Sequence, residues 1–146
     1  MNREILFKAK RKDDGEWVEG YYLNVAKINH FICTGKIKLN GAVKGILAPE
    51  MYAIDPDTLC QYTGLTDKNG QKIWEGDIVT CSKRRRIEGY DMYKVVWRKD
   101  FADFGVEPLM YGAQYPIGFV FGGSLYGRDY KVIGNIFDNP ELLEVE

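Results

Sequence analysis

The sequence predicts a mainly β protein, with an N-terminal β-hairpin region at residues 1–60 and a small SH3-like barrel at residues 61–146. Two observations predict this class. No window of about 11 or more residues has the apolar spacing of an amphipathic helix. Short runs of β-branched and aromatic residues instead recur between clusters of Gly, Asn and Asp, which is the pattern of short strands joined by tight turns.

The first hairpin is expected from residues 5–10 and 17–23, on either side of Asp13, Asp14 and Gly15. An Asp side chain can accept a backbone hydrogen bond and open a type I turn. Gly adopts the left-handed backbone conformation that closes such a turn. The spacing therefore predicts two antiparallel strands at the start of the chain.

Two further turns are predicted by the same reasoning. Asn40 and Gly41 are the preferred residues for the two central positions of a type I′ turn. Residues 67–70, Asp-Lys-Asn-Gly, repeat the chemistry of the first hairpin. The flanking strands are expected at residues 36–39, 42–44, 59–65 and 73–74.

The C-terminal part is expected to be a set of short strands with glycines at the corners, which suits a small barrel. Residues 99–116 mix Gly, Pro and aromatic side chains and predict a long irregular connection, a kind of segment that is usually functional. After residue 138, a cap residue, a Pro and an acid, Asn139, Pro140 and Glu141, predict one short helical turn. The strands are expected at residues 77–81, 92–97, 117–121 and 131–137.

The composition indicates a soluble cytoplasmic protein. The chain of 146 residues has three cysteines, an odd number without close spacing, which suits reduced thiols better than a disulfide framework. Its first residues lack the apolar stretch of a secretory signal. No run approaches the roughly 18 to 20 apolar residues of a membrane helix.

The candidate chemical groups do not form a recognisable catalytic pattern, so we expect no enzyme activity, metal or cofactor. The possible zinc ligands are His30, Cys33, Cys60 and Cys81, but they lack the paired knuckle that presents two ligands from one turn. A Ser/His/Asp triad would depend on the single histidine, and there is no nucleophile elbow. Two pairs of carboxylates, Asp55 with Asp57 and Glu75 with Asp77, are expected in turns, where acidic side chains have structural roles.

Residues 61–70, Gln-Tyr-Thr-Gly-Leu-Thr-Asp-Lys-Asn-Gly, continue with Ile-Trp-Glu-Gly-Asp-Ile-Val at residues 73–79. This run resembles the signature of the YopX family of phage and prophage proteins, and residues 3–9 and 132–141 resemble the same family. The resemblance implies a β-rich fold that includes an SH3-like barrel and a phage-type accessory role. It carries over no catalytic or binding residue.

The expected activity is binding of another protein, either a second copy or a host or phage protein. Aromatic and long apolar side chains concentrate in the expected connection, and exposed groups of this kind mark partner surfaces. The alternative is that the connection folds back and caps the barrel. The candidate partner-binding residues are Phe101, Phe104, Met110, Tyr111 and Tyr115. Nine basic against six acidic residues at 61–100, and two against seven at 101–146, also permit contact between subunits.

Nucleic acid is the alternative partner, because four adjacent cations can neutralise backbone phosphates. They are Lys83, Arg84, Arg85 and Arg86. Against this, the chain as a whole has a net charge of −1. A charged run at a loop is often a solvated tip that keeps strand edges from pairing.

Overall fold

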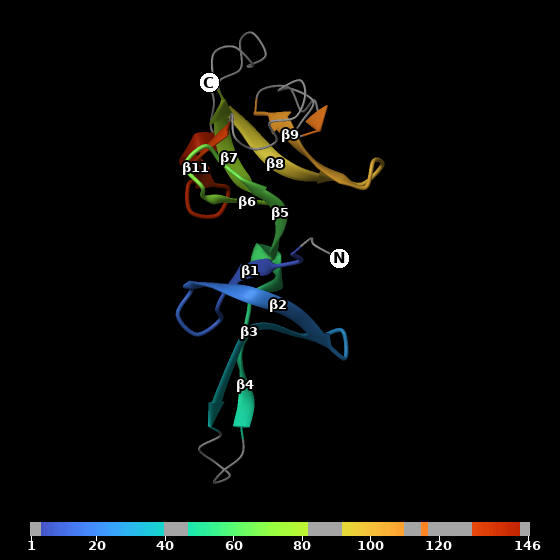
Figure 1. Ribbon diagram of the computed structural model, residues 1–146, viewed down its shortest axis with the longest axis vertical. Coiled ribbons are helices and arrows are strands. Elements are labelled where there is room, and N and C mark those ends of the chain that lie inside the picture. The colour runs from blue at the N-terminus through green and yellow to red at the C-terminus, as the bar shows by residue number, and fades with distance from the viewer. Residues whose placement is uncertain (1–3, 40–46, 82–91, 110–114, 117–129, 144–146) are drawn as a thin grey trace. The chain divides into compact units, whose positions relative to one another are not determined.

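The computed structural model describes residues 4–39, 47–81, 92–109, 115–116 and 130–143. These residues confirm a mainly β fold, with antiparallel strands and two short 3-10 helices (Figure 1). The chain divides into two compact units, unit 1 at Met1–Gln61 and unit 2 at Tyr62–Glu146.

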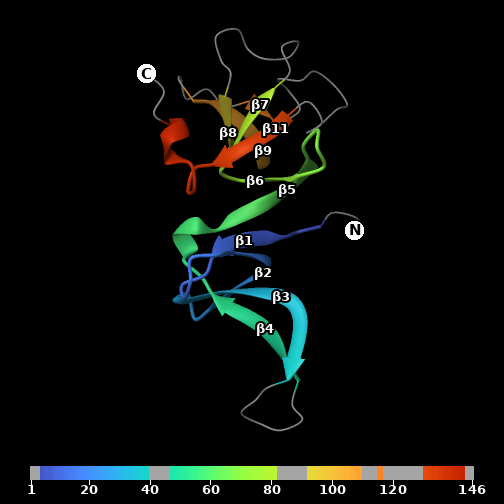
Figure 2. The ribbon, with the colours of Figure 1, turned by 90° about the vertical axis from the view of Figure 1, so that its left-hand side faces the viewer.

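Unit 1 is built on an antiparallel sheet whose strands lie in the order β4-β3-β2-β1 (Figure 2). Strand β1 also pairs with the first residues of β5, in the register Phe7↔Gln61 and Lys8↔Cys60. The elements are β1 Phe7–Lys10, β2 Trp17–Val25, β3 Asn29–Leu39, β4 Leu47–Ala53, η1 Pro56–Thr58 and β5 Cys60–Thr66.

The predicted first turn is confirmed. The φ of Gly15 is 72°, and its N–H donates to the carbonyl of Arg11 at 3.0 Å. The Asp14 carboxylate accepts the N–H of Glu16 at 2.9 Å. Asn40 and Gly41 lie outside the described residues, as does the strand expected at 42–44.

The core of unit 1 lies on one face of this sheet. Ala9, Ile32 and Ile54 are fully buried there. The partly buried side chains packed around them are Phe7, Val18, Tyr22 and Leu59. Because side chains alternate between the faces of a strand, the opposite face of β2 and β3 is left outside this core.

Unit 2 contains a five-stranded antiparallel sheet in the order β10-β9-β8-β7-β11 (Figure 1), and β6 pairs with β5. The predicted helical turn near the C-terminus is confirmed as η2. The SH3-like barrel stays a prediction, and the strand expected at 117–121 lies outside the described residues. The elements are β6 Lys72–Trp74, β7 Asp77–Cys81, β8 Met92–Arg98, β9 Asp103–Pro108, β10 Tyr115–Pro116, β11 Tyr130–Asn135 and η2 Pro140–Leu143.

The prediction of a long irregular connection at residues 99–116 is wrong for the first half of that segment. Strand β9 pairs with β8 along its whole length, from Arg98↔Asp103 to Tyr93↔Pro108. Val106 is fully buried opposite Val95, and burial of such apolar cross-strand pairs stabilises a hairpin although Gly and Pro lie nearby in the sequence. Only a short turn remains between β8 and β9.

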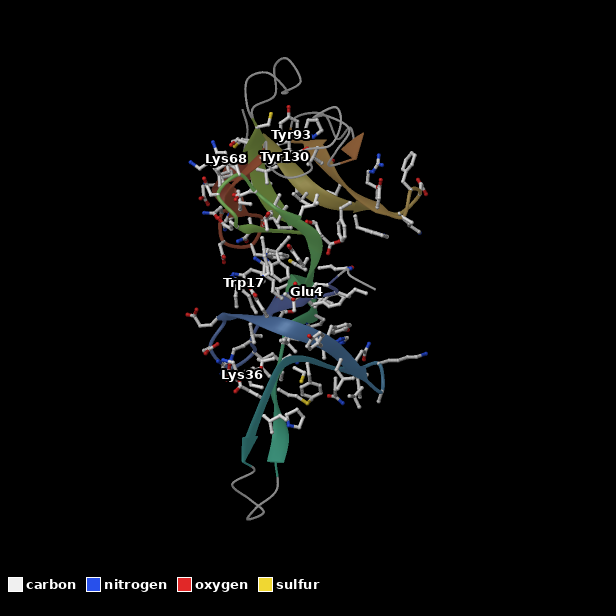
Figure 3. All side chains as sticks on the ribbon, in the orientation of Figure 1. Glu4, Trp17, Lys36, Lys68, Tyr93 and Tyr130 are labelled. Atoms are coloured by element: carbon white, nitrogen blue, oxygen red, sulfur yellow. The ribbon has the colours of Figure 1, made fainter. Side chains whose placement is uncertain are left out.

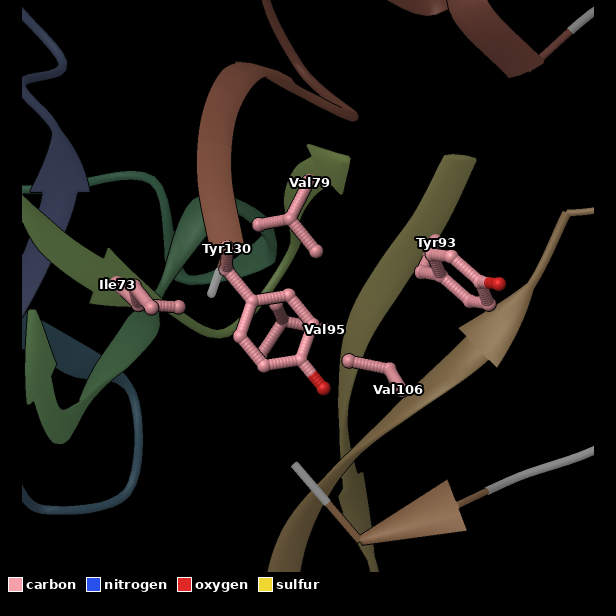
Figure 4. Packing of buried hydrophobic residues seen from close by; sticks show 6 residues of the cluster. All are labelled: Ile73, Val79, Tyr93, Val95, Val106 and Tyr130. Atoms are coloured by element: carbon pink, nitrogen blue, oxygen red, sulfur yellow. The ribbon is translucent and has the colours of Figure 1, made fainter. Parts of the chain in front are cut away.

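The core of unit 2 draws side chains from five strands (Figure 4). Tyr93 and Tyr130 are its largest fully buried side chains. The remaining buried members are Ile73, Val79, Val95 and Val106. Leu65, Cys81, Phe104 and Val132 pack against this cluster and are partly buried.

Candidate interaction surfaces

The β8–β9 hairpin extends past strand β7 (Figure 1) and carries exposed aromatic side chains. Trp97 and Phe104 lie opposite each other, with ring centroids 4.9 Å apart in an edge-to-face arrangement. Trp97 is 45% exposed, and Phe101, in the turn, is 69% exposed. The apolar face of the hairpin therefore continues from the buried core into solvent.

Arg98 holds the base of this turn. Its Nε and Nη2 donate to the two carboxylate oxygens of Asp103, both at 2.7 Å. These bonds raise the pKa of Arg98 above its usual value, although burial opposes the effect. The guanidinium lies 4.2 Å from the ring centroid of Phe101, so the same side chain fixes the hairpin and supports the most exposed aromatic ring at its tip.

The structure brings two of the five candidate partner-binding residues together on this hairpin. Phe101 is exposed, whereas Phe104 is half-buried against the core of unit 2. The backbone of Tyr115 pairs with Val106. Met110 and Tyr111 lie outside the described residues. So do the four cations of the nucleic-acid alternative, Lys83, Arg84, Arg85 and Arg86.

Sequence reasoning missed Trp97 as a surface residue. It lies on the strand face that also carries Tyr93 and Val95, so its position in a strand indicates burial. The core of unit 2 ends before it covers Trp97, and no local sequence pattern shows where a core ends.

A second surface, which we call the outer face, lies on strands β2, β3 and β4 of unit 1. Tyr21 is 56% exposed, and Leu23 and Val25 are each 44% exposed. Directly opposite residues share a sheet face, and the register places Tyr21 beside Cys33 and Leu23 beside Phe31. The register places these residues on the outer face: Tyr21, Leu23, Val25, Asn29, Phe31, Cys33, Met51 and Ala53.

Apart from Asn29, each of these outer-face residues is apolar or a thiol, although the face lies opposite the core of unit 1. Soluble proteins usually place polar side chains on the solvent face of an antiparallel sheet. Contiguous exposed apolar patches of this kind mark interaction sites. The alternation Tyr21, Leu23, Val25 was available in the sequence as a signal, but only the pairing with β3 and β4 shows that it extends across three strands.

The groups considered for metal binding and catalysis are not gathered in one place. Among the described residues, no group of three or more His, Cys, Asp or Glu side chains is placed to hold a metal ion. The hydroxyl of Tyr22 lies 2.5 Å from Nδ1 of His30. Asp55 caps helix η1 by accepting the N–H of Asp57 at 3.0 Å, and Asp77 accepts the N–H of Trp74 at 2.8 Å. Both carboxylates therefore have structural roles.

Comparison with known proteins identifies the family. The model of the family described as YopX protein matches residues 6–144. The chain belongs to the YopX family. This YopX-family protein is also similar to a solved structure, protein EF1440 from Enterococcus faecalis, with 28% sequence identity and a TM-score of 0.60 over 98% of this chain and 100% of that chain. Comparison with curated proteins finds no match.

The signature residues of the YopX-family protein build two turns in unit 2. The N–H of Gly70, whose φ is 80°, donates to the carbonyl of Asp67 at 3.0 Å. Gly76, with φ of 84°, donates its N–H to the carbonyl of Val95 at 2.8 Å. The predicted cross-strand pair of Tyr62 and Trp74 is confirmed, with ring centroids 5.5 Å apart. The signature thus describes backbone geometry.

Within the part of the YopX-family chain that the structure describes, neither short helix is long and apolar enough to cross a membrane.

Proposed function

We propose that this YopX-family protein is a non-enzymatic, phage- or prophage-type accessory protein of the cytoplasm that binds another protein. The observation that carries this proposal is the outer face, where exposed apolar side chains of β2 continue into partly exposed ones on β3 and β4 on one side of a sheet. Covering such a face removes apolar surface from water, which is the main favourable term in protein association.

The β8–β9 hairpin supports the same function. Its exposed rings, Trp97 and Phe101, are large anchors of the kind that contribute most at protein interfaces. The paired Arg98 and Asp103 hold the turn that carries them. A preformed hairpin loses little conformational freedom on binding, so more of the contact energy appears as affinity.

The test compares surface variants in a tagged capture experiment and in sedimentation analysis. Leu23→Ser with Val25→Ser changes the outer face, and Asn24→Ser is its matched control, since Asn24 is exposed on the other side of the same strand. We expect the double variant to lose a specific protein partner, or self-association, and the control to keep it. Equal binding by both variants would remove the outer face from the proposal.

The hairpin is tested in the same way with Phe101→Ser, and Lys99→Ser is the matched control because it is an exposed residue of the same turn. We expect reduced capture for the first variant alone. Capture that is unchanged by Phe101→Ser would leave the hairpin as a structural element.

The nucleic-acid alternative depends on the basic run at residues 83–86, which separates β7 from β8 in the sequence. Each capture is therefore repeated after nuclease treatment and over a series of salt concentrations. Phosphate binding weakens steeply as salt rises. A partner that is lost after nuclease treatment and as the salt concentration rises would favour nucleic acid over protein.

A further inference from the structure

The outer face of unit 1 continues along β3 and β4 past a bulge. After this bulge, which contains Lys36 (Figure 3), Ile37 lies opposite Pro49. Pro49 is two residues from Met51 in β4, and residues two apart in a strand share a face. Ile37 and Pro49 therefore lie on the same side of the sheet as Met51. Because Ile37 is 68% exposed, the apolar surface reaches beyond the bulge.

None of the ten described residues that the register places on the outer face carries a charge. Along β2, the nearest charged residue on this side is Glu19, which lies opposite Lys8 in the β1–β2 ladder. The face thus has an apolar centre and charged residues at its rim, which is the anatomy of a protein interface. The ten residues are Tyr21, Leu23, Val25, Asn29, Phe31, Cys33, Ile37, Pro49, Met51 and Ala53.

The lack of charge among these ten residues favours a second copy of the chain as the partner. In a two-fold symmetric interface the same patch of both copies meets, so a charged residue near the axis faces its own counterpart. Like charges placed opposite each other oppose binding strongly. An uncharged face avoids this repulsion, and it offers no complementary charge to a charged partner. Interfaces between identical subunits are also more apolar than those between different proteins.

The exposed area of the outer face also suits a dimer. The most exposed of its large side chains belong to Tyr21, Leu23, Val25 and Ile37. From their exposed fractions, these four residues present roughly 400 Å² to solvent. With the partly exposed members, the face offers roughly 600 Å², so two copies bury about 1,200 Å² in total, the lower end of the range for specific interfaces.

We propose that this YopX-family protein forms a two-fold symmetric dimer in which the outer faces of two copies pack against each other. Two antiparallel sheets pack in this way in β-sandwiches, with their apolar side chains interdigitated. Strand β3 lies between β2 and β4, so the symmetry brings Cys33 of one copy near Cys33 of the other. The inference rests on the proposed function, because it names the partner of the same surface.

The first experiment is sedimentation velocity of the full chain over a series of concentrations. For an interface of this size we expect a reversible dimer with a dissociation constant of about 10 μM or lower. A chain that stays monomeric at about 100 μM, well above that constant, overturns the inference.

Variants then assign the association to the outer face. Ile37→Ser is expected to raise the dissociation constant of the dimer at least about tenfold, because each change occurs twice in a symmetric interface. Lys36→Ser is the matched control, since Lys36 is the exposed neighbour of Ile37 in β3, and it should associate like the wild type. Equal association of the two variants overturns the inference. Circular dichroism checks that both are folded.

Cross-linking tests the predicted approach of the two Cys33 thiols without altering an apolar side chain. A short bis-maleimide is expected to join two copies of the wild type and to join far fewer copies of Cys33→Ser. Cys81→Ser is the control, because Cys81 is also a partly exposed thiol but belongs to β7 of unit 2. It should cross-link like the wild type. Cross-linking that persists in Cys33→Ser overturns the inference.

The capture experiment with Leu23→Ser and Val25→Ser separates this inference from the proposed function. A monomeric chain that captures a different protein through these residues overturns the dimer and leaves the proposed function in place. A monomeric chain whose outer face captures nothing overturns the dimer and removes the outer face from the proposed function. A dimer that is lost in this double variant supports both.

Discussion

The carboxylate of Asp67 accepts the backbone N–H of Val132, with Oδ2 and N 3.0 Å apart, although the two residues are separated by 65 positions in the sequence. Its other oxygen, Oδ1, accepts the N–H groups of Asn69 at 2.8 Å and Gln71 at 2.9 Å. Asp67 is only 3% exposed. One buried side chain therefore shapes the β5–β6 turn and also anchors strand β11.

Asp67→Asn is expected to lower the free energy of unfolding by about 2 kcal/mol, because the amide group must direct a donor at a buried N–H. Urea unfolding followed by circular dichroism measures the change. Asp55→Asn is the control: Asp55 makes a similar local bond to Asp57 at an exposed site, and Asn is an equally good cap. Equal losses in the two variants would contradict the role assigned to the Val132 contact.

The same carboxylate predicts a pH dependence. Burial by itself raises the pKa of Asp67, but the N–H groups of Val132, Gln71 and Asn69 together lower it below its usual value. A group with a lowered folded-state pKa stabilises the fold above its unfolded pKa, about 3.9, and this contribution is lost as the pH falls through the folded-state pKa.

We therefore expect the stability difference between wild type and Asp67→Asn to be constant near neutral pH and to narrow below about pH 4, since a protonated Asp67 also carries a donor. Unfolding experiments over a pH series check this. A difference that stays the same, or widens, in acid would show that the carboxylate is not stabilised by these bonds.

The β2–β3 turn contains two residues in an unfavourable conformation. Ala26 and Lys27 have φ values of 55° and 62°, and the N–H of Ile28 donates to the carbonyl of Val25 at 3.3 Å. Positive φ at both central positions defines a type I′ turn, which Asn-Gly adopts best. Ala26→Asn with Lys27→Gly is expected to raise the melting temperature, by an amount that corresponds to about 1 kcal/mol.

Lys36→Gly is the control for this turn, because Lys36 is an exposed residue of strand β3, where Gly costs roughly 0.5–1 kcal/mol. If the double variant and Lys36→Gly were both stabilised, or if neither were, the turn assignment would be contradicted.

Gly20 lies where strands β2 and β3 approach closely. A Cβ at this position would be 2.1 Å from the carbonyl oxygen of Cys33, a backbone atom that cannot move aside. We expect Gly20→Ala to destabilise unit 1 by about 3 kcal/mol or more, as severe overpacking does. Gly15→Ala is the comparison, because φ is 72° there but no atom lies within 4 Å of the added Cβ. It should cost only about 1–2 kcal/mol.

The predicted turns at Gly15 and Gly70 are present because their chemistry is local. An Asp side chain bonds to an N–H two residues away, and Gly permits the positive φ that follows. The turn at Ala26 and Lys27 has neither residue type, so its sequence carries no such signal. The pairing of β2 with β3 imposes its conformation, and local propensity is overruled by the contacts of the sheet.

Strand β9 is a second case in which contacts within the sheet overrule the local sequence pattern. Gly105 and Pro108 made residues 99–116 look irregular, yet burial of Val106 against Val95 makes residues 103–108 a strand. Within the candidate site, the exposure of Phe101 was predicted from the sequence, whereas the exposure of Trp97 was not. Exposure depends on where the sheet ends, which is a property of the whole unit.

The sequence by itself determined the fold class of this protein, its turns at Gly15 and Gly70 and its family, because turn chemistry and strand alternation act over a few residues. Only the tertiary structure decided which apolar side chains are covered. Tyr21, Leu23 and Val25 have the same alternation as a buried strand, but the register of β2 with β3 turns them away from Ile32 and the core. Shifting a strand pairing by one residue exchanges the two faces, so the long-range contacts that set the register also place the outer face in solvent.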